Sequence, residues 1–216
     1  MHSLSLGRDA TSPLVVLCLG AHSDDIEIGC GGTILRLAWQ YPNCVFHWVV
    51  FSAIGVRADE ARRAATLFAG ACTLNGPVLK TYQDGFMPFV GAEVKTVFEE
   101  LKSISPDLIF AHSRNDAHQD HRLLAELTWN TFRDHLILEY EIPKYDGDLG
   151  HPSVFVPLDL GLCEKKIHYL IDTFQSQHSK RWFQPETFLS LLRLRGMECN
   201  APSGYAEAFY SRKLMF

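Results

Sequence analysis

The feature that most constrains the fold is a regular alternation of short apolar runs with helical patterns over the first two-thirds of the chain. The apolar runs are typical of strands that are buried on both faces, and lie at 14–19, 45–51, 78–82 and 108–111. The segments between them have helical composition or apolar residues at helical spacing, and lie from about 33 and at 58–69, 94–103 and 122–132. This alternation predicts a mostly parallel sheet covered by helices on both faces.

The last third of the chain is less regular. A further strand is expected at 136–140, followed by a long loop over 142–153 that contains prolines and glycines. Helices near 163–174 and 186–195 and a final strand at 206–210 complete the pattern. Because no segment has the composition of a linker, we predict one three-layer, Rossmann-like α/β domain over residues 1–216, with a C-terminal elaboration.

Composition limits the classes of partner. The formal net charge of −5 gives no electrostatic reason to expect nucleic acid or an anionic membrane surface. The six cysteines form no Cys-x-x-Cys pair, which favours a reducing compartment. The first residues lack the pattern of a signal peptide, and the apolar run at 14–19 is too short to cross a bilayer, which takes about 20 residues. We therefore expect a cytoplasmic protein without membrane insertion; a homo-oligomer is compatible with the sequence but not defined by it.

Two polar segments directly follow two of the predicted strands. The first is Ala21–Thr33 (AHSDDIEIGCGGT), and the second is Ala111–Arg122 (AHSRNDAHQDHR). In open parallel sheets, ligands bind outside the carboxyl ends of the strands. Right-handed crossover connections place both segments at the same edge of the sheet. The two segments are therefore the candidate functional site.

His22, Asp25 and His121 in these segments form a set of two histidines and one carboxylate. Three protein ligands and a water are the usual composition of a catalytic zinc site, and such a zinc lowers the pKa of its water to about 7. Fe(II) suits the same donors. Either segment alone is more often an ordinary polar loop, and their shared position at strand ends favours a metal site.

The remaining polar residues suggest catalytic roles. Asp24, beside a candidate ligand, is placed to act as the general base that takes a proton from water. His118 could stabilise developing charge or protonate the leaving group. Asp120 could orient a metal-binding histidine by contact with its other ring nitrogen. The glycines that begin at Gly29 come about ten residues after the strand, too late for a dinucleotide-binding loop. Cys30 is a candidate nucleophile by proximity alone, and a small packed residue is the simpler interpretation.

These segments resemble the signature of the PIG-L, or LmbE-like, family of zinc-dependent N-acetylglucosamine deacetylases. The family pattern reads Ala-His-Pro-Asp-Asp-x-Glu-x-Gly-x-Gly-Gly-Thr in the first segment and Asp-x-His-x-Asp-His-Arg in the second. The resemblance is good over residues 15–132 and looser through 207. Two departures stand out, because Ser23 replaces the family's proline and Asp116 lies near a position where some relatives supply a tyrosine as oxyanion donor.

The resemblance implies a role for each matched residue. It implies zinc ligation by His22, Asp25 and His121, Asp24 as general base, and His118 as the residue near the substrate carbonyl or the leaving amine. It also implies that Arg57 and Asp84 bind sugar hydroxyls, and that the glycines let the backbone approach the metal loop and start the helix. In the predicted loop, Tyr145 could stack on a pyranose ring, although a solvated loop explains the composition equally well.

The expected function is hydrolysis of the acetamido group of an N-acetylated amino sugar or sugar conjugate, with release of acetate. Two alternatives stay open at this point. One is an amidase that acts on a larger conjugate of the sugar–thiol type, and the other is a non-catalytic sugar-binding protein. The sequence does not define the sugar, nor whether it is free, nucleotide-linked or lipid-linked.

Overall fold

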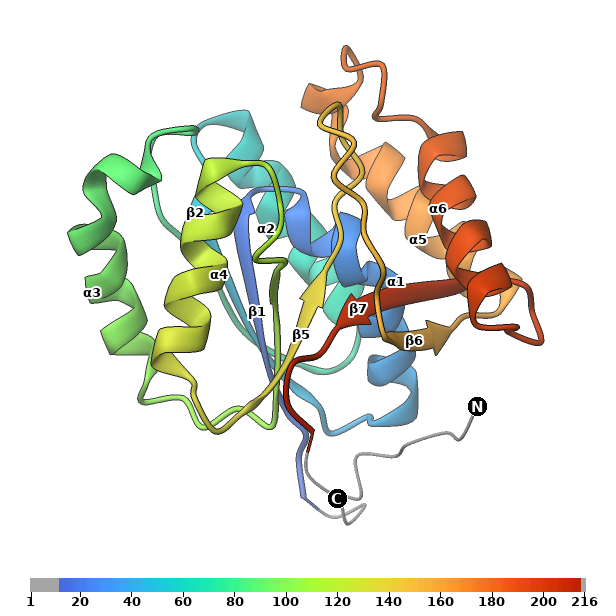
Figure 1. Cartoon of the computed structure of the whole chain (residues 1–216), viewed down its shortest axis with the longest axis horizontal. Helices are drawn as coiled ribbons and strands as arrows, with labels where there is room; N and C mark the ends of the chain where they lie inside the picture. Colours follow the sequence, from blue (N-terminus) through green and yellow to red (C-terminus); the bar gives the residue numbers. More distant parts are fainter. Residues whose placement is uncertain (1–11, 215–216) are drawn as a thin grey trace.

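The protein is a single α/β domain built on a seven-stranded sheet. It is represented by a computed structural model that describes residues 12–214. The sheet has the order β3-β2-β1-β4-β5-β7-β6 (Figure 1). Five neighbouring strands are parallel, namely β1 (Val15–His22), β2 (Val45–Ser52), β3 (Thr73–Leu79), β4 (Leu108–His112) and β5 (Leu136–Tyr140). The other two are antiparallel, β6 (Val154–Pro157) and β7 (Ala206–Tyr210). The predicted Rossmann-like fold is therefore confirmed.

Helices cover both faces of the sheet. The α-helices are α1 (Asp25–Gln40), α2 (Val56–Ala69), α3 (Gly91–Leu101), α4 (Gln119–Thr131), α5 (Leu160–Thr173) and α6 (Pro185–Glu198). Two short 3₁₀ helices are η1 (Met87–Val90) and η2 (Gln175–Gln177). Alternate side chains of β1 enter different cores: Val16 and Cys18 pack with α1, α2 and α5, whereas Leu17 and Leu19 pack with α3 and α4. Burial on both faces explains the continuous apolar runs in the sequence.

The topology creates a binding position between β1 and β4. From β1 the chain proceeds outward to β2 and β3, and then returns to place β4 on the other side of β1. At such a reversal of strand order, the loops after the two strands diverge and leave a crevice at their carboxyl ends. These ends face the top of Figure 1, toward which the β5 arrow points. His22 is the last residue of β1, and His112 is the last residue of β4.

The glycine-rich part of the first segment is helical, which corrects the predicted helix start near Thr33. Helix α1 begins at Asp25, so Gly29, Gly31 and Gly32 lie inside it. A Cβ on Gly29 would lie 2.2 Å from the Tyr140 ring, and a Cβ on either of the other two would lie within 2.5 Å of a side chain. The glycines therefore allow α1 to pack closely, rather than to start. Periodicity missed the first turns of this helix because glycine carries no side chain to define an apolar face.

Two further elements differ from the predictions. Strand β3 begins at Thr73 rather than near 78. The sequence did not show this start because the polar Asn75 and Gly76 interrupt the apolar pattern of the strand. Strand β6, directly after the predicted loop, was not expected; its short pairing with β7 is antiparallel and its residues are only partly buried. Among residues 12–214, no helix is both long enough and apolar enough to cross a membrane.

A buried ion pair fixes α1 to the C-terminal elaboration. Lys166 Nζ on α5 lies 2.6 Å from Glu207 Oε1 on β7 and donates to the carbonyl oxygen of Ile28 at 2.6 Å. The Glu207 carboxylate also accepts the amides of Gly32 and Thr33, at 2.7 and 2.6 Å. A regular helix joins the amide of residue 32 to the carbonyl of residue 28. Here the ion pair contacts both groups, so the C-terminal third helps to hold the helix that follows the candidate metal loop.

Candidate metal centre and active site

Three donor atoms converge at the carboxyl ends of β1 and β4. Asp25 Oδ2 lies 3.3 Å from His22 Nδ1 and 3.5 Å from His121 Nε2. The two histidine nitrogens are 3.1 Å apart. A tetrahedral metal with bonds of about 2.0–2.2 Å separates its ligands by roughly 3.3–3.6 Å. The three side chains predicted as ligands are therefore brought together, from the end of β1, the start of α1 and the first turn of α4, at separations that suit one metal ion.

Carboxylates lie behind both histidines. His121 Nδ1 is 2.9 Å from Asp116 Oδ2, while His22 Nε2 is 3.0 Å from Asp84 Oδ1 and 3.4 Å from Asp120 Oδ2. A carboxylate beside the ring nitrogen that faces away from the donor set holds a proton on that nitrogen, so the other ring nitrogen can turn its lone pair toward the centre. The two inward nitrogens, 3.1 Å apart, share a proton as a hydrogen bond in the absence of a cation, and both can turn a lone pair toward a cation that binds between them. The donor set and its surroundings therefore fit a divalent metal.

Asp25 is turned away from solvent and onto the end of β1. Its Oδ2 accepts the backbone amide of His22 at 2.6 Å. Burial opposes its ionisation, but the imidazoles of His121, His112 and His22 hold the pKa of the Asp25 carboxyl well below its usual range. An ionised, buried carboxylate among histidines is the charge state that a metal ligand requires.

His112 belongs to the site, although sequence reasoning gave it no role. Its ring stacks on that of His121, with centroids 3.9 Å apart, and its Nε2 is 3.2 Å from Asp25 Oδ2. Asp25, His112 and His121 also form a group whose donor atoms lie within 4.8 Å of one another. His112 Nε2 accepts the amide of Ala21 at 2.9 Å, which favours support over ligation. The missed signal was its place as the last residue of a buried strand, the same place that His22 occupies.

Asp24 lies beside the donor atoms in a different environment from Asp25. Its Oδ1 accepts from Arg57 NH2 at 2.8 Å, and the residue is 4% exposed. Burial raises the pKa of Asp24 above its usual value, and the Arg57 guanidinium offsets part of that rise. A base with a raised pKa binds a proton more readily. The two adjacent aspartates therefore differ in pKa: the lowered pKa of Asp25 suits a metal ligand, and the raised pKa of Asp24 suits a base.

The mouth of the site is more exposed than its floor. The side chains of Asp84, His118 and Arg57 are 56%, 27% and 24% exposed. Burial, with the neighbouring histidines 121 and 22, lowers the pKa of His118, whose Nε2 is 3.8 Å from Asp84 Oδ1. Arg57 NH1 is 3.9 Å from Asp84 Oδ2. These three side chains are therefore the ones that a molecule entering the site would meet first.

Asp120 is buried below this mouth and organises the loop that carries Asp84. Its two carboxylate oxygens accept the amides of Gly85 and Met87 at 2.7 and 3.1 Å. This pins the loop after β3 against α4 and brings Asp84 to His22. Asp120 thus contacts both His22 and the mouth loop without itself facing solvent, and its orienting role stays a prediction.

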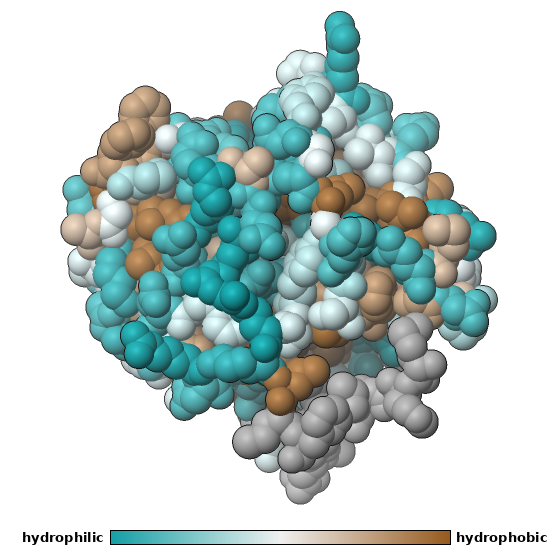
Figure 2. Space-filling view, in the orientation of Figure 1, coloured by the Kyte–Doolittle hydropathy of each residue, from teal (hydrophilic) through white to brown (hydrophobic). Residues whose placement is uncertain are grey.

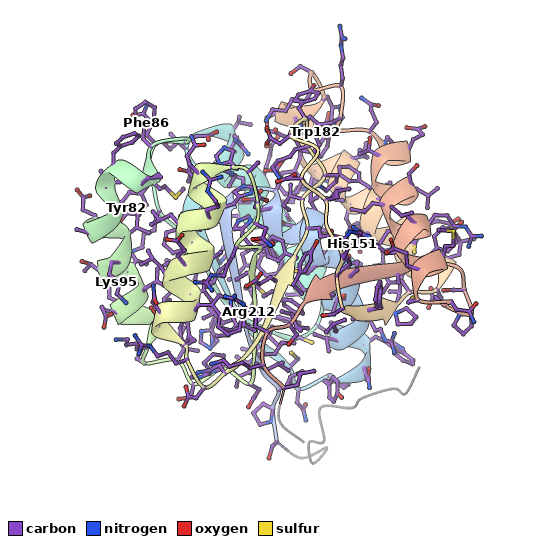
Figure 3. All side chains as sticks on the ribbon, viewed as in Figure 1. Tyr82, Phe86, Lys95, His151, Trp182 and Arg212 are labelled. Atoms are coloured by element: carbon purple, nitrogen blue, oxygen red, sulfur yellow. The ribbon has the colours of Figure 1, made fainter. Side chains whose placement is uncertain are left out.

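The contacts of Tyr145 and Cys30 are with backbone groups outside the donor set. Tyr145 is 71% exposed, and its Oη accepts the amide of Arg181 at 3.2 Å. Figure 3 labels Phe86 and Trp182 along the upper edge, and Figure 2 shows apolar atoms at the upper left of a largely hydrophilic face. Cys30 is buried within α1, where burial raises the pKa of its thiol and its Sγ contacts the Ile26 carbonyl. The structure supports the packed interpretation of Cys30.

The fold and the donor groups define a Rossmann-like α/β protein with a candidate single-metal centre at the reversal of its strand order. The chain belongs to the PIG-L family, because the profile described as GlcNAc-PI de-N-acetylase matches residues 17–132, just over half of the 216 residues.

Solved structures of similar fold include enzymes of more than one reaction type. N,N'-diacetylchitobiose deacetylase from Pyrococcus horikoshii is 20% identical, with a TM-score of 0.70 over 96% of this chain and 88% of that one. A zinc-inhibited form of teicoplanin deacetylase is 13% identical, with a TM-score of 0.65 over 91% and 97%. The 4-carboxy-2-hydroxymuconate hydratase from Pseudomonas putida is 17% identical, with a TM-score of 0.75 over 94% and 98%. Similarity at this level shows the fold, so the reaction has to be argued from the site.

Proposed function

We propose that this protein is a metal-dependent N-deacetylase that hydrolyses the acetamido group of an N-acetylated amino sugar or sugar conjugate. The observation that carries the proposal is the convergence of His22 Nδ1, Asp25 Oδ2 and His121 Nε2 within 3.1–3.5 Å of one another, beside a separate buried acid, Asp24. Amide hydrolysis needs an electrophilic centre and a base that is not a ligand. Membership of a family described by a de-N-acetylase supports the same reaction.

The chemistry divides between the metal and the chain's own residues. When bound, zinc or Fe(II) would be held by His22, Asp25 and His121, and would supply a Lewis acid that polarises a carbonyl and acidifies water. Asp24 takes a proton from the attacking water while the oxygen of that water bonds to the acetyl carbon. The carbon–nitrogen bond then breaks, and the amine leaves with a proton while acetate is formed. His118, at the mouth, stabilises the developing charge or protonates the amine.

Substrate binding is assigned to the exposed part of the site. The Asp84 carboxylate and the Arg57 guanidinium lie together at the mouth and offer an acceptor and donors for sugar hydroxyls. Arg57 would do so while it holds Asp24. Tyr145 is a candidate stacking residue at the outer edge, with a solvated loop as the competing explanation. The proposed partner is a small amino sugar rather than nucleic acid.

The test is acetate release from a panel of N-acetylated amino sugars that includes free, nucleotide-linked and lipid-linked members. We expect one acetate for each amine formed, loss of turnover after chelation, and recovery on adding Zn2+ or Fe2+. Amine without acetate from a larger conjugate would favour the amidase alternative, and binding without turnover would favour a sugar-binding protein. Purified protein should carry about one metal per chain; full occupancy in His121→Ala would contradict the ligand assignment.

A further inference from the structure

The loop between β5 and β6 reaches the candidate metal centre through one lysine. Lys144 Nζ lies 3.0 Å from Asp116 Oδ1 and 2.5 Å from Asp148 Oδ2. The Lys144 side chain is only 10% exposed, and that of Asp116 is 3% exposed. The other oxygen of Asp116, Oδ2, is 2.9 Å from His121 Nδ1. A continuous chain of charged and polar contacts therefore runs from Lys144 through Asp116 to a candidate ligand.

We infer that Lys144 is a positioning residue that fixes the Asp116 carboxylate against His121 and thereby sets the metal affinity of the site. The inference rests on the proposed role of His121 as a ligand. It gives a function to a lysine in the most irregular part of the chain, which neither the two polar segments nor the family motif contains.

The geometry explains why the lysine is needed. Asp116 Oδ1 accepts the amide of His118 at 2.8 Å in addition to its contact with Lys144, so two donors hold this oxygen. With Oδ1 fixed, Oδ2 faces His121 Nδ1 and keeps the imidazole in the orientation that presents Nε2 to the centre. The carboxylate is buried, and Lys144 is a cation in direct contact with it. Without that contact the carboxylate loses part of the charge compensation and one of the groups that fix its rotation.

The loop itself is held so that Lys144 is presented from a fixed position. Asp148 Oδ2, which contacts Lys144, also accepts the amide of Ala117 at 2.7 Å. The loop is thus attached to the second polar segment by Asp148 as well as by Lys144. Tyr145 follows directly and contacts the amide of Arg181. One short loop therefore connects the outer edge of the site to the residue behind a candidate ligand.

The experiment is a double-mutant cycle read as Zn2+ affinity, measured on the full chain by competition with a chelator. Removal of a partner of a metal-bound histidine commonly costs about 10–100-fold in metal affinity. We expect Lys144→Met to lose about tenfold, at the lower end of that range, and Asp116→Asn to lose about 10–100-fold. Because Lys144 acts through Asp116, the double variant should bind Zn2+ as Asp116→Asn does. The absorption spectrum of the Co2+ form should shift in Lys144→Met, since the ligand orientation changes.

A matched control is Lys80→Met, which removes a lysine whose ion pair, 3.8 Å long, is with Glu100 on α3 and not with a carboxylate of the site. It should leave Zn2+ affinity unchanged. Wild-type Zn2+ affinity in Lys144→Met would overturn the inference. It would also be overturned if Lys144→Met lowered the affinity of Asp116→Asn by the same factor as it lowers that of the wild type, because the lysine would then act through loop packing. If Lys144→Met does not fold, Lys144→Gln is carried through the same cycle. A wild-type protein that binds Zn2+ but releases no acetate would contradict the proposed function. The double-mutant cycle would still test the role of Lys144, because it is read as Zn2+ affinity.

Discussion

The sharpest test of the mechanism replaces each of two adjacent aspartates with asparagine. Asp24 and Asp25 have the same side chain, but Asp25 Oδ2 lies 3.3 and 3.5 Å from the two histidine donors, whereas Asp24 Oδ1 is held by Arg57. Asp24→Asn keeps the size and an oxygen acceptor for Arg57, but cannot take a proton from water. We therefore expect it to retain metal and to lose activity.

The expected loss follows from the contribution of a positioned base. General-base catalysis supplies about 10²–10⁴-fold, which corresponds to about 3–5 kcal/mol of transition-state stabilisation. Asp24→Asn should therefore lower kcat by that factor. His118→Ala should likewise keep metal and turn over slowly. Asp25→Asn should instead lose metal affinity, and activity with it, because a neutral amide replaces the carboxylate among three imidazoles.

The assay is metal content, measured alongside kcat and KM for acetate release across pH. Burial raises the pKa of Asp24, so the acid limb of the wild-type kcat/KM profile should lie above the ordinary aspartate value of about 3.9 and be absent in Asp24→Asn. Asp59→Asn is the matched control: Asp59 pairs with Arg62 at 2.8 Å but is 79% exposed on α2. Near-wild-type turnover in Asp24→Asn would show that another residue is the base.

Three further predictions concern the mouth, the packing of α1 and acid stability. Alanine at Arg57 or Asp84 should lower kcat/KM at least tenfold, since a hydrogen bond to a charged group contributes about 1.5–3 kcal/mol. Metal content should stay intact in the Arg57 variant, whereas the Asp84 variant should also bind metal more weakly, because Asp84 Oδ1 contacts His22 Nε2. Wild-type kinetics in both variants would reject the substrate role. Gly29→Ala should lower Tm, because its Cβ would meet an aromatic ring at 2.2 Å, whereas Gly91→Ala, with open space and ordinary backbone, should not. The partners of Asp116 hold the pKa of its carboxyl low, so its contribution to the stability of the folded state is present above about pH 4 and is lost on acidification. The difference in Tm between wild type and Asp116→Asn, measured without metal, should therefore shrink as the pH falls below about 4.

Much of the fold was readable because burial on both faces of the sheet forces apolar runs into the sequence. The strands at 136–140 and 206–210 have the predicted bounds, and β1, β2 and β4 were found where apolar residues are continuous, whereas β3 was found only in part. The predictions failed where side-chain pattern carries little information. The glycines of α1 have no side chains to show a period, and β6 is a short edge strand that is only partly buried.

The sequence by itself determined the residue types and the edge of the sheet at which they meet. The strand ends placed His22, Asp25 and His121 at one edge, with His121 directly before the helix predicted at 122–132, which in the structure begins at Gln119. Only the tertiary structure decided which oxygen or nitrogen faces which partner, because those contacts join residues far apart in the chain. The contact of His112 with Asp25, the ion pair between Arg57 and Asp24 and the contact of Lys144 with Asp116 are all of this kind. Local sequence sets backbone conformation, but the direction of a buried polar side chain is set by whatever distant group compensates its charge.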